Sequence, residues 1–262
     1  MVNGIIARVS RGSVMDQVYL PKNRSSALGI GEYVVIAPAL QKKQITPYYY
    51  NAQNIEPIKA EIIQGILSNS EAENIIIAGS FLEKGFNFED IDIIVINGEG
   101  KAIEKYAETA FGLKAHIINM KYDTLRTGLN TDPLFQMILS RFAAKERLLL
   151  NIKQEINYKL LDMHLLKSKI LPEQFEHLNG IEKFILTRNM VAIRLFIEGK
   201  TATIDKVNKE INNLFGKDAA SKLLENTMEK LPFTAKYKEI YRKVFNAIMD
   251  GISHNAKQKQ AG

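Results

Sequence analysis

The chain contains no cysteine, which excludes disulfide bonds, thiolate metal sites and cysteine nucleophiles. It also lacks any run of about eighteen apolar residues, the length that a transmembrane helix requires. Residues 1–12 lack the long apolar core of a secretory signal. From these absences we expect a cytoplasmic protein without a membrane segment.

What is present is ordinary for a globular protein of 262 residues, with 46% hydrophobic and 24% charged side chains. The basic excess of six is unevenly distributed. Residues 1–50 carry six basic and two acidic side chains, residues 51–154 carry eleven and fourteen, and residues 155–262 carry eighteen and thirteen. The two flanking segments are therefore basic, which favours a polyanionic partner such as RNA or DNA. A lysine-rich solvated surface is the alternative.

Residue patterns divide the chain and predict an α+β protein. Residues 55–153 alternate helix and strand, with a helix from Pro57, a helix over 101–111, a strand over 114–120 and a last strand over 147–150. Residues 154–252 contain only helical patterns, broken into about five helices typical of a bundle. The expected order is a β-hairpin or barrel-like module (1–40), a linker (41–54), a mixed sheet with helices (55–153), a helical bundle (154–252) and a disordered tail (253–262).

One stretch of the middle segment carries residues suited to chemistry. A buried strand pattern, 75–77, breaks at Gly79-Ser80, and Asp90 and Asp92 then open a second apolar run. Residues two apart on a strand share a face, so both carboxylates point the same way. Paired carboxylates near a glycine turn can hold Mg²⁺ against a phosphate. An ordinary turn and a solvated strand start are the alternative, but Asp92 lies inside an apolar run, where an unpaired charge is costly.

Gly-Ser, nine residues and then Asp-x-Asp resembles the nucleotidyltransferase superfamily that includes DNA polymerase beta and its minimal relatives. The resemblance implies transfer of a nucleoside monophosphate from an NTP to a hydroxyl on RNA, protein or a small molecule, with Mg²⁺ or Mn²⁺ as cofactor. Gly79 and Ser80 would bind phosphate, through the Ser80 hydroxyl and the N–H groups of a helix or turn expected to begin there. Asp90 and Asp92 would bind the metal.

The family's third carboxylate has no direct equivalent, because His116 stands at the matching position on the next expected strand. A neutral imidazole could accept the proton of the incoming hydroxyl, while a purely structural histidine is the alternative. Asp123 could instead supply a carboxylate from a loop. If neither does, the resemblance implies a weak or inactive member that acts as a DNA-, RNA- or ribonucleoprotein-binding factor or a transcriptional regulator.

Residues 18–36, VYLPKNRSSALGIGEYVVI, follow another pattern: an apolar strand, Leu-Pro-Lys, an Arg, Leu-Gly-Ile and a closing apolar strand. This pattern resembles the swapped-hairpin module of AbrB-like transcription factors over about the first 38 residues. The resemblance implies a homodimer that places basic residues on DNA, and the candidate phosphate contacts are Arg8, Arg11, Lys22 and Arg24. A dimerisation or docking module without DNA is the alternative.

Two further groups have competing interpretations. Tyr48 to Tyr50 follow two lysines and could stack on bases, but we favour their packing onto a neighbouring domain. Arg188 and Arg194 could reach a triphosphate or an RNA backbone, whereas surface salt bridges are the favoured alternative. The bundle contains no Arg-x₄₋₆-His pair, so it has no ribonuclease signature of the HEPN type.

Overall fold

The structure is a computed structural model that describes residues 9–10, 15, 17–20, 29–30, 45–86, 88–148 and 151–260. Residues 1–44 and 45–262 form two compact units. In the first unit, strands β1 (Val9–Ser10) and β2 (Gln17–Val18) pair antiparallel. This pairing is the expected N-terminal hairpin. The four basic side chains predicted to contact DNA, at 8, 11, 22 and 24, lie outside the described residues.

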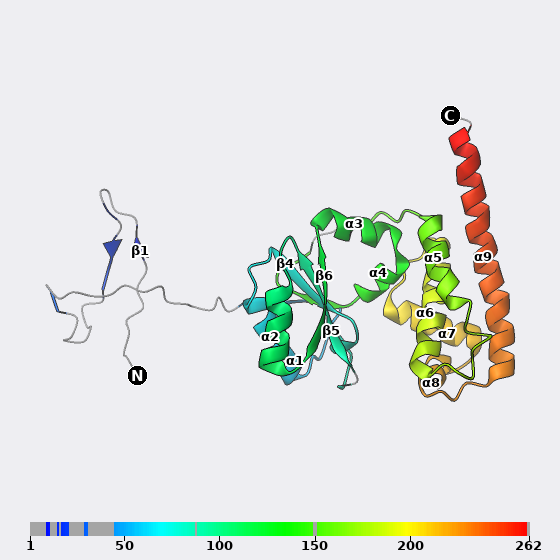
Figure 1. Cartoon of the computed structure of the whole chain (residues 1–262), viewed down its shortest axis with the longest axis horizontal. Helices are drawn as coiled ribbons and strands as arrows, with labels where there is room; N and C mark the ends of the chain where they lie inside the picture. Colours follow the sequence, from blue (N-terminus) through cyan, green and yellow to red (C-terminus); the bar gives the residue numbers. More distant parts are fainter. Residues whose placement is uncertain are drawn as a thin grey trace. The chain divides into compact units, whose positions relative to one another are not determined.

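The second unit combines a five-stranded sheet with helices (Figure 1). Its sheet part contains β3 (Tyr48–Tyr50), α1 (Pro57–Ser68), β4 (Asn74–Ala78), the 3₁₀ turn η2 (Ser80–Leu82), β5 (Asp90–Ile96), α2 (Lys101–Phe111), β6 (Lys114–Met120), α3 (Tyr122–Thr131), α4 (Pro133–Ile138) and β7 (Phe142–Ala144). Its helical part contains α5 (Tyr158–Ser168), α6 (Gly180–Ile197), α7 (Ile204–Phe215), α8 (Ala219–Leu224) and α9 (Lys230–Gln260). The α+β prediction is confirmed.

The sheet is mixed, with strand order β3-β7-β4-β5-β6. β5 and β6 run parallel, joined by α2, and every other neighbouring pair is antiparallel. Parallel neighbours need a crossover connection, which α2 supplies after ending at Gly112 in the left-handed conformation. Because β4 and β5 are antiparallel, the end of β4 and the start of β5 lie at the same edge of the sheet.

Each face of the sheet has its own apolar core. On β5 the residues Ile91, Ile93 and Val95 pack with side chains of α1 and α2, whereas Ile94 and Ile96 pack with side chains of α3 and α4. This alternation follows from the two-residue period of a strand. Asp92 has the parity of Ile94, so its side chain lies on the face that α3 and α4 cover.

α4 belongs to the sheet part but packs against both the sheet and the bundle. Met137 belongs to the apolar core of the bundle, while Leu139, just past the end of α4, belongs to the core of the sheet. At the start of α4, Asp132 accepts hydrogen bonds from the N–H groups of Leu134 and Phe135. The other oxygen of Asp132 lies 3.0 Å from Nε2 of His164 on α5. This N-cap therefore also ties the two parts together.

Three boundaries differ from the sequence predictions. Residues 48–50 form an edge strand paired with β7, and the Tyr50 and Phe142 rings stack 5.1 Å apart, so this part of the linker packs onto the sheet as favoured. The structure has a strand at 142–144; of the strand expected over 147–150, residues 147–148 are not in a strand and residues 149–150 lie outside the described residues. Residues 253–260, expected to be disordered, continue α9. None of the helices in the described ranges combines the length and apolar character needed to cross a membrane.

Candidate functional site

The turn after β4 requires glycine. Gly79 has φ +79° and ψ −161°, a backbone region that side chains make inaccessible. A Cβ at this position would also lie 2.2 Å from Oδ2 of Asp92. Gly79 therefore allows the carboxylate of Asp92 to lie directly against the turn. This close approach of the two motif halves is the tightest feature of the site.

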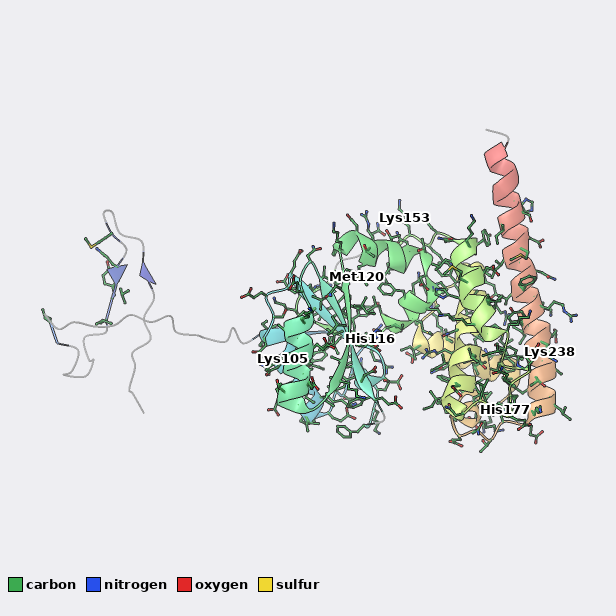
Figure 2. All side chains as sticks on the ribbon, in the orientation of Figure 1. Lys105, His116, Met120, Lys153, His177 and Lys238 are labelled. Atoms are coloured by element: carbon green, nitrogen blue, oxygen red, sulfur yellow. The ribbon has the colours of Figure 1, made fainter. Side chains whose placement is uncertain are left out.

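Asp92 also meets His116, its neighbour on the parallel strand. The register places Ala78, Asp92 and His116 in one row across β4, β5 and β6. Nδ1 of His116 lies 3.1 Å from Oδ1 of Asp92, and the two side chains are 60% and 35% exposed. A carboxylate can only accept, so Nδ1 carries the proton in this contact, which leaves Nε2 as an acceptor when the ring is neutral. Figure 2 labels His116 on β6.

Asp90 and Ser80 lie at the same edge of the sheet and are both exposed. Asp90 is the first residue of β5 and has Lys114 as its register partner. Ser80 begins η2, so a turn follows Gly79 as one of the two expected alternatives, but its three residues are too few to form an anion site at a helix N-terminus. Across the described ranges, no three or more His, Asp and Glu side chains gather in an arrangement that could hold a metal ion.

Asp123, the alternative source of a carboxylate, is placed elsewhere. It lies in the first turn of α3, is 86% exposed on its side chain, and pairs with Arg126 at 3.5 Å. β6 runs from Lys114 to Met120. His116 lies near the start of this strand, whereas Asp123 follows its last residue. Four residues of strand separate His116 from that end, about 13 Å at the usual rise. The structure therefore does not bring Asp123 to Asp92.

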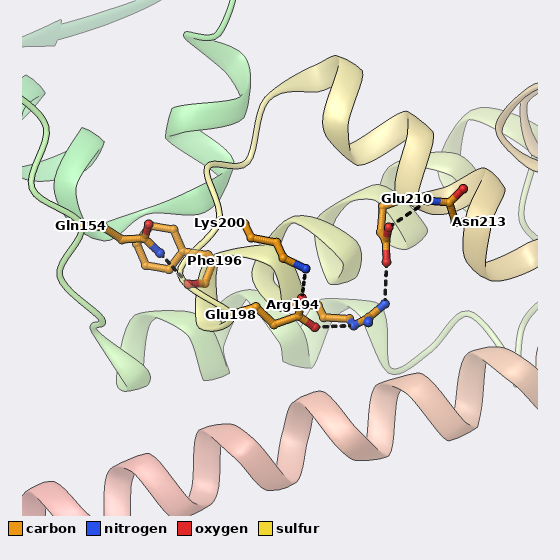
Figure 3. A network of polar contacts seen from close by, with 7 residues as sticks. All are labelled: Gln154, Arg194, Phe196, Glu198, Lys200, Glu210 and Asn213. Carbon is orange, nitrogen blue, oxygen red and sulfur yellow. Dashed lines mark hydrogen bonds and ion pairs between the residues drawn. The ribbon is translucent and has the colours of Figure 1, made fainter.

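The two arginines of α6 have different surroundings. Arg194 pairs with Glu198 and Glu210, each at 2.9 Å, in the network of Figure 3. The salt-bridge interpretation is thus confirmed for Arg194. Arg188 differs, because its Nε is buried with no hydrogen-bond partner in the described part of the chain. Burial lowers the pKa of Arg188, and the nearby charge of Glu83 raises it.

A residue that the sequence analysis did not single out organises the segment that follows η2. Lys59 on α1 is completely buried, and its Nζ donates to the carbonyl oxygens of Glu83 and Gly85, each at 2.5 Å. It also pairs with Glu56 at 3.2 Å, and the other oxygen of Glu56 accepts from the N–H of Gly85. The sequence does indicate that Lys59 is buried, because it occupies a position of the apolar stripe that continues at Ile62 and Ile66.

Lys59 thereby holds the chain between the two halves of the motif. Its ammonium lies 5.3–5.7 Å from the ring centroids of Phe81, Phe86 and Phe88. Such cation–π contacts add to the hydrogen bonds and are stronger away from water. Among the described residues, Lys59 forms no hydrogen bond or ion pair with Asp90 or Asp92, so it acts on the site by positioning the loop. Searches of protein-family models, of curated proteins and of solved structures found no match to the chain.

Proposed function

We propose that the chain is a nucleotidyltransferase that moves a nucleoside monophosphate from an NTP to a hydroxyl acceptor on RNA, protein or a small molecule. The observation that carries the proposal is the position of Asp92, held between the Gly79 turn on one side and His116 on the other. The same edge of the sheet carries three exposed side chains, those of Asp90, His116 and Ser80. These groups suit the transfer of a phosphoryl centre to a hydroxyl.

The carboxylates of Asp90 and Asp92 fit a magnesium or manganese ion. Mg²⁺ is commonly held by one or two carboxylates together with substrate phosphates, so these two side chains supply enough protein ligands. The close approach at Gly79 leaves Oδ2 of Asp92 next to a backbone that has no side chain. A bound Mg²⁺ would neutralise phosphate charge during the transfer.

The remaining residues have separate roles in this proposal. His116 accepts the acceptor hydroxyl's proton at Nε2, while Asp92 holds Nδ1–H and so orients the ring. The hydroxyl oxygen bonds to the α-phosphorus of the NTP, the bond from that phosphorus to the bridging oxygen breaks, and pyrophosphate leaves. The Ser80 hydroxyl donates to a phosphate oxygen.

The test uses NTP binding and transfer together. Calorimetry of the four NTPs with Mg²⁺ or Mn²⁺ identifies the nucleotide bound by the parent chain. The variant D90A/D92A should lose that binding and should not label any acceptor with an α-labelled NTP. The matched control is Asp123→Ala, which removes an exposed carboxylate beyond the other end of β6 and should leave both readouts unchanged. Labelling that survives in D90A/D92A would refute the assignment.

One observation favours a second candidate, a nucleotidyltransferase-like protein without turnover that binds DNA, RNA or a ribonucleoprotein, or regulates transcription. Oδ1 of Asp92 is already engaged by His116, which competes with a metal for that oxygen. This candidate predicts no NTP consumption with either metal but a salt-sensitive gel shift with nucleic acid. The N-terminal hairpin would supply the homodimer, which sedimentation can detect.

A further inference from the structure

The bundle carries a groove that the proposed transfer reaction does not use. It has a volume of about 250 Å³ and lies where α9 passes the segment that follows α5. α5 and α9 pack against each other along the bundle (Figure 1). Its lining includes charged and aromatic side chains: Lys169, Glu173, Lys238, Tyr241, Arg242 and Phe245.

The cations of this groove are free, in contrast to others on the same helix. Lys169, Lys238 and Arg242 are exposed, and none of them makes an ion pair in the described part of the chain. Lys236 and Lys243, also on α9, both pair with Glu239, at 3.0 and 2.7 Å. Glu239 therefore offsets one of the two charges on that side of α9, while the three groove cations have no such partner among the described residues. Figure 2 labels Lys238 on α9.

Acidic groups only partly offset this charge. Glu173 is the one carboxylate among the groove's lining residues. Burial raises the pKa of Tyr241, and the nearby charge of Asp162 raises it further, so a second carboxylate lies close to the ring. Three cations face these two carboxylates. The balance stays positive and suits a ligand with a repeating negative charge.

Two aromatic rings stand beside the cations. Tyr241 and Phe245 are one helical turn apart, with their ring planes within 8° of parallel and their centroids 6.4 Å apart. Phe245 is 37% exposed, although large apolar rings are normally buried. Lys238 and Arg242 show the same one-turn spacing, so cations and rings form two adjacent rows along α9. A nucleic-acid strand carries its phosphates along one side and its bases along the other, which matches a row of cations beside a row of rings.

We propose that this groove binds a single-stranded polynucleotide, with phosphates on Lys169, Lys238 and Arg242 and a base stacked on Phe245. A single strand fits better than a duplex, because only unpaired bases can leave their neighbours and stack on a side chain. An acidic peptide would use the cations but would gain nothing from the exposed ring. The inference does not depend on the proposed transferase activity, since strand binding needs neither an NTP nor Asp92.

The test measures fluorescence anisotropy of a labelled single-stranded RNA, and of DNA of the same sequence, over a range of KCl concentrations. Neutralising the three cations in K169Q/K238Q/R242Q should flatten the slope of log K against log salt by about two, because each lost phosphate contact removes roughly 0.7. Phe245→Leu keeps an apolar side chain but loses the aromatic face. It should weaken binding by roughly 5- to 100-fold without changing the salt slope.

The control is K236Q/K243Q on the same helix, which removes two lysines already paired with Glu239 and should change affinity by less than about threefold. Circular dichroism and melting curves check that each variant remains folded. Two results would overturn the inference: a salt slope in K169Q/K238Q/R242Q equal to that of the parent, or competition by polyglutamate as effective as that by unlabelled strand. Loss of binding in D90A/D92A with all groove variants normal would also overturn it, because the strand would then sit at the Asp92 site.

Discussion

Replacing Lys59 with methionine tests whether a single buried ammonium holds the loop beside the candidate site. The methionine side chain keeps most of the apolar stem of Lys59, so packing on α1 changes little. The ammonium disappears, and with it the hydrogen bonds to the carbonyl oxygens of Glu83 and Gly85 and the pair with Glu56. The two carbonyl groups then lose their donor in a partly buried place.

The expected cost follows from these contacts. Removing one partner of a buried ion pair typically costs about 3–5 kcal/mol, because the other groups stay buried and unpaired. Glu56 is 24% exposed on its side chain and can regain water, so we expect about 2–4 kcal/mol for Lys59→Met. For a folded unit of this size, that cost corresponds to a fall in melting temperature of about 5–15 °C. Lys84→Met, an exposed neighbour, should cost less than about 0.5 kcal/mol.

Urea denaturation of both variants measures the free energy of unfolding. Amide hydrogen exchange adds a local readout, since the N–H of Gly85 donates to Glu56 and should exchange faster once the loop is released. The reasoning fails if Lys59→Met and Lys84→Met have equal stability, or if exchange at residues 83–86 is unchanged. In either case the loop would be held by its phenylalanine rings alone.

Two other predictions concern the turn and the link between sheet and bundle. Gly79→Ala should cost at least about 2–3 kcal/mol and abolish NTP binding, because the new Cβ meets Oδ2 of Asp92 in a glycine-only conformation. Gly85→Ala shares a positive φ but has no atom within 4 Å of its Cβ, so it should cost about 1–2 kcal/mol and leave binding intact; equal loss of binding in both variants would contradict the clash. Burial raises the pKa of Asp132, but the hydrogen bond and charge of His164 and the N–H donors of α4 lower it by more, so the folded pKa lies below the ordinary 3.8. The stabilisation by Asp132 is therefore complete above about pH 4 and is lost as the pH falls through the lowered pKa. Asp132→Asn should cost about 1 kcal/mol near pH 7 in urea denaturation, and the difference from the parent should shrink in acid; a difference that is constant with pH would refute the ionic contribution.

The sheet part was predictable where local patterns agreed with tertiary packing. The helix 101–111 and the strand 114–120 match the expected bounds, because an apolar period and a terminal glycine signal both. The strand Phe142–Ala144 was missed since Phe-Ala-Ala has weak strand preference, whereas the leucines at 148–150 attract the prediction. Its pairing with β3 and β4, which no local pattern reveals, makes it a strand.

In the candidate site, too, some features follow from local sequence and others depend on tertiary packing. Local sequence was enough to predict the turn at Gly79 and the placement of Asp90 and Asp92 on one face of the next strand, because side chains alternate along a strand. The contact between Asp92 and His116 depends on the parallel register of β5 and β6, which a sequence alone does not set. The free Nε of Arg188 depends on how α6 packs, and helical spacing carries no information about that.

The division of α4 between two cores limits how the protein can move. Met137 is anchored in the bundle and Leu139 in the sheet, only two residues apart. Swinging the bundle away from the sheet would pull one of these side chains out of its core and expose it to water, at a cost of about 2 kcal/mol. The packing of this segment into both cores therefore opposes a swing of the bundle away from the sheet. Domain closure over a substrate would have to be small, and the two parts should melt in a single cooperative step.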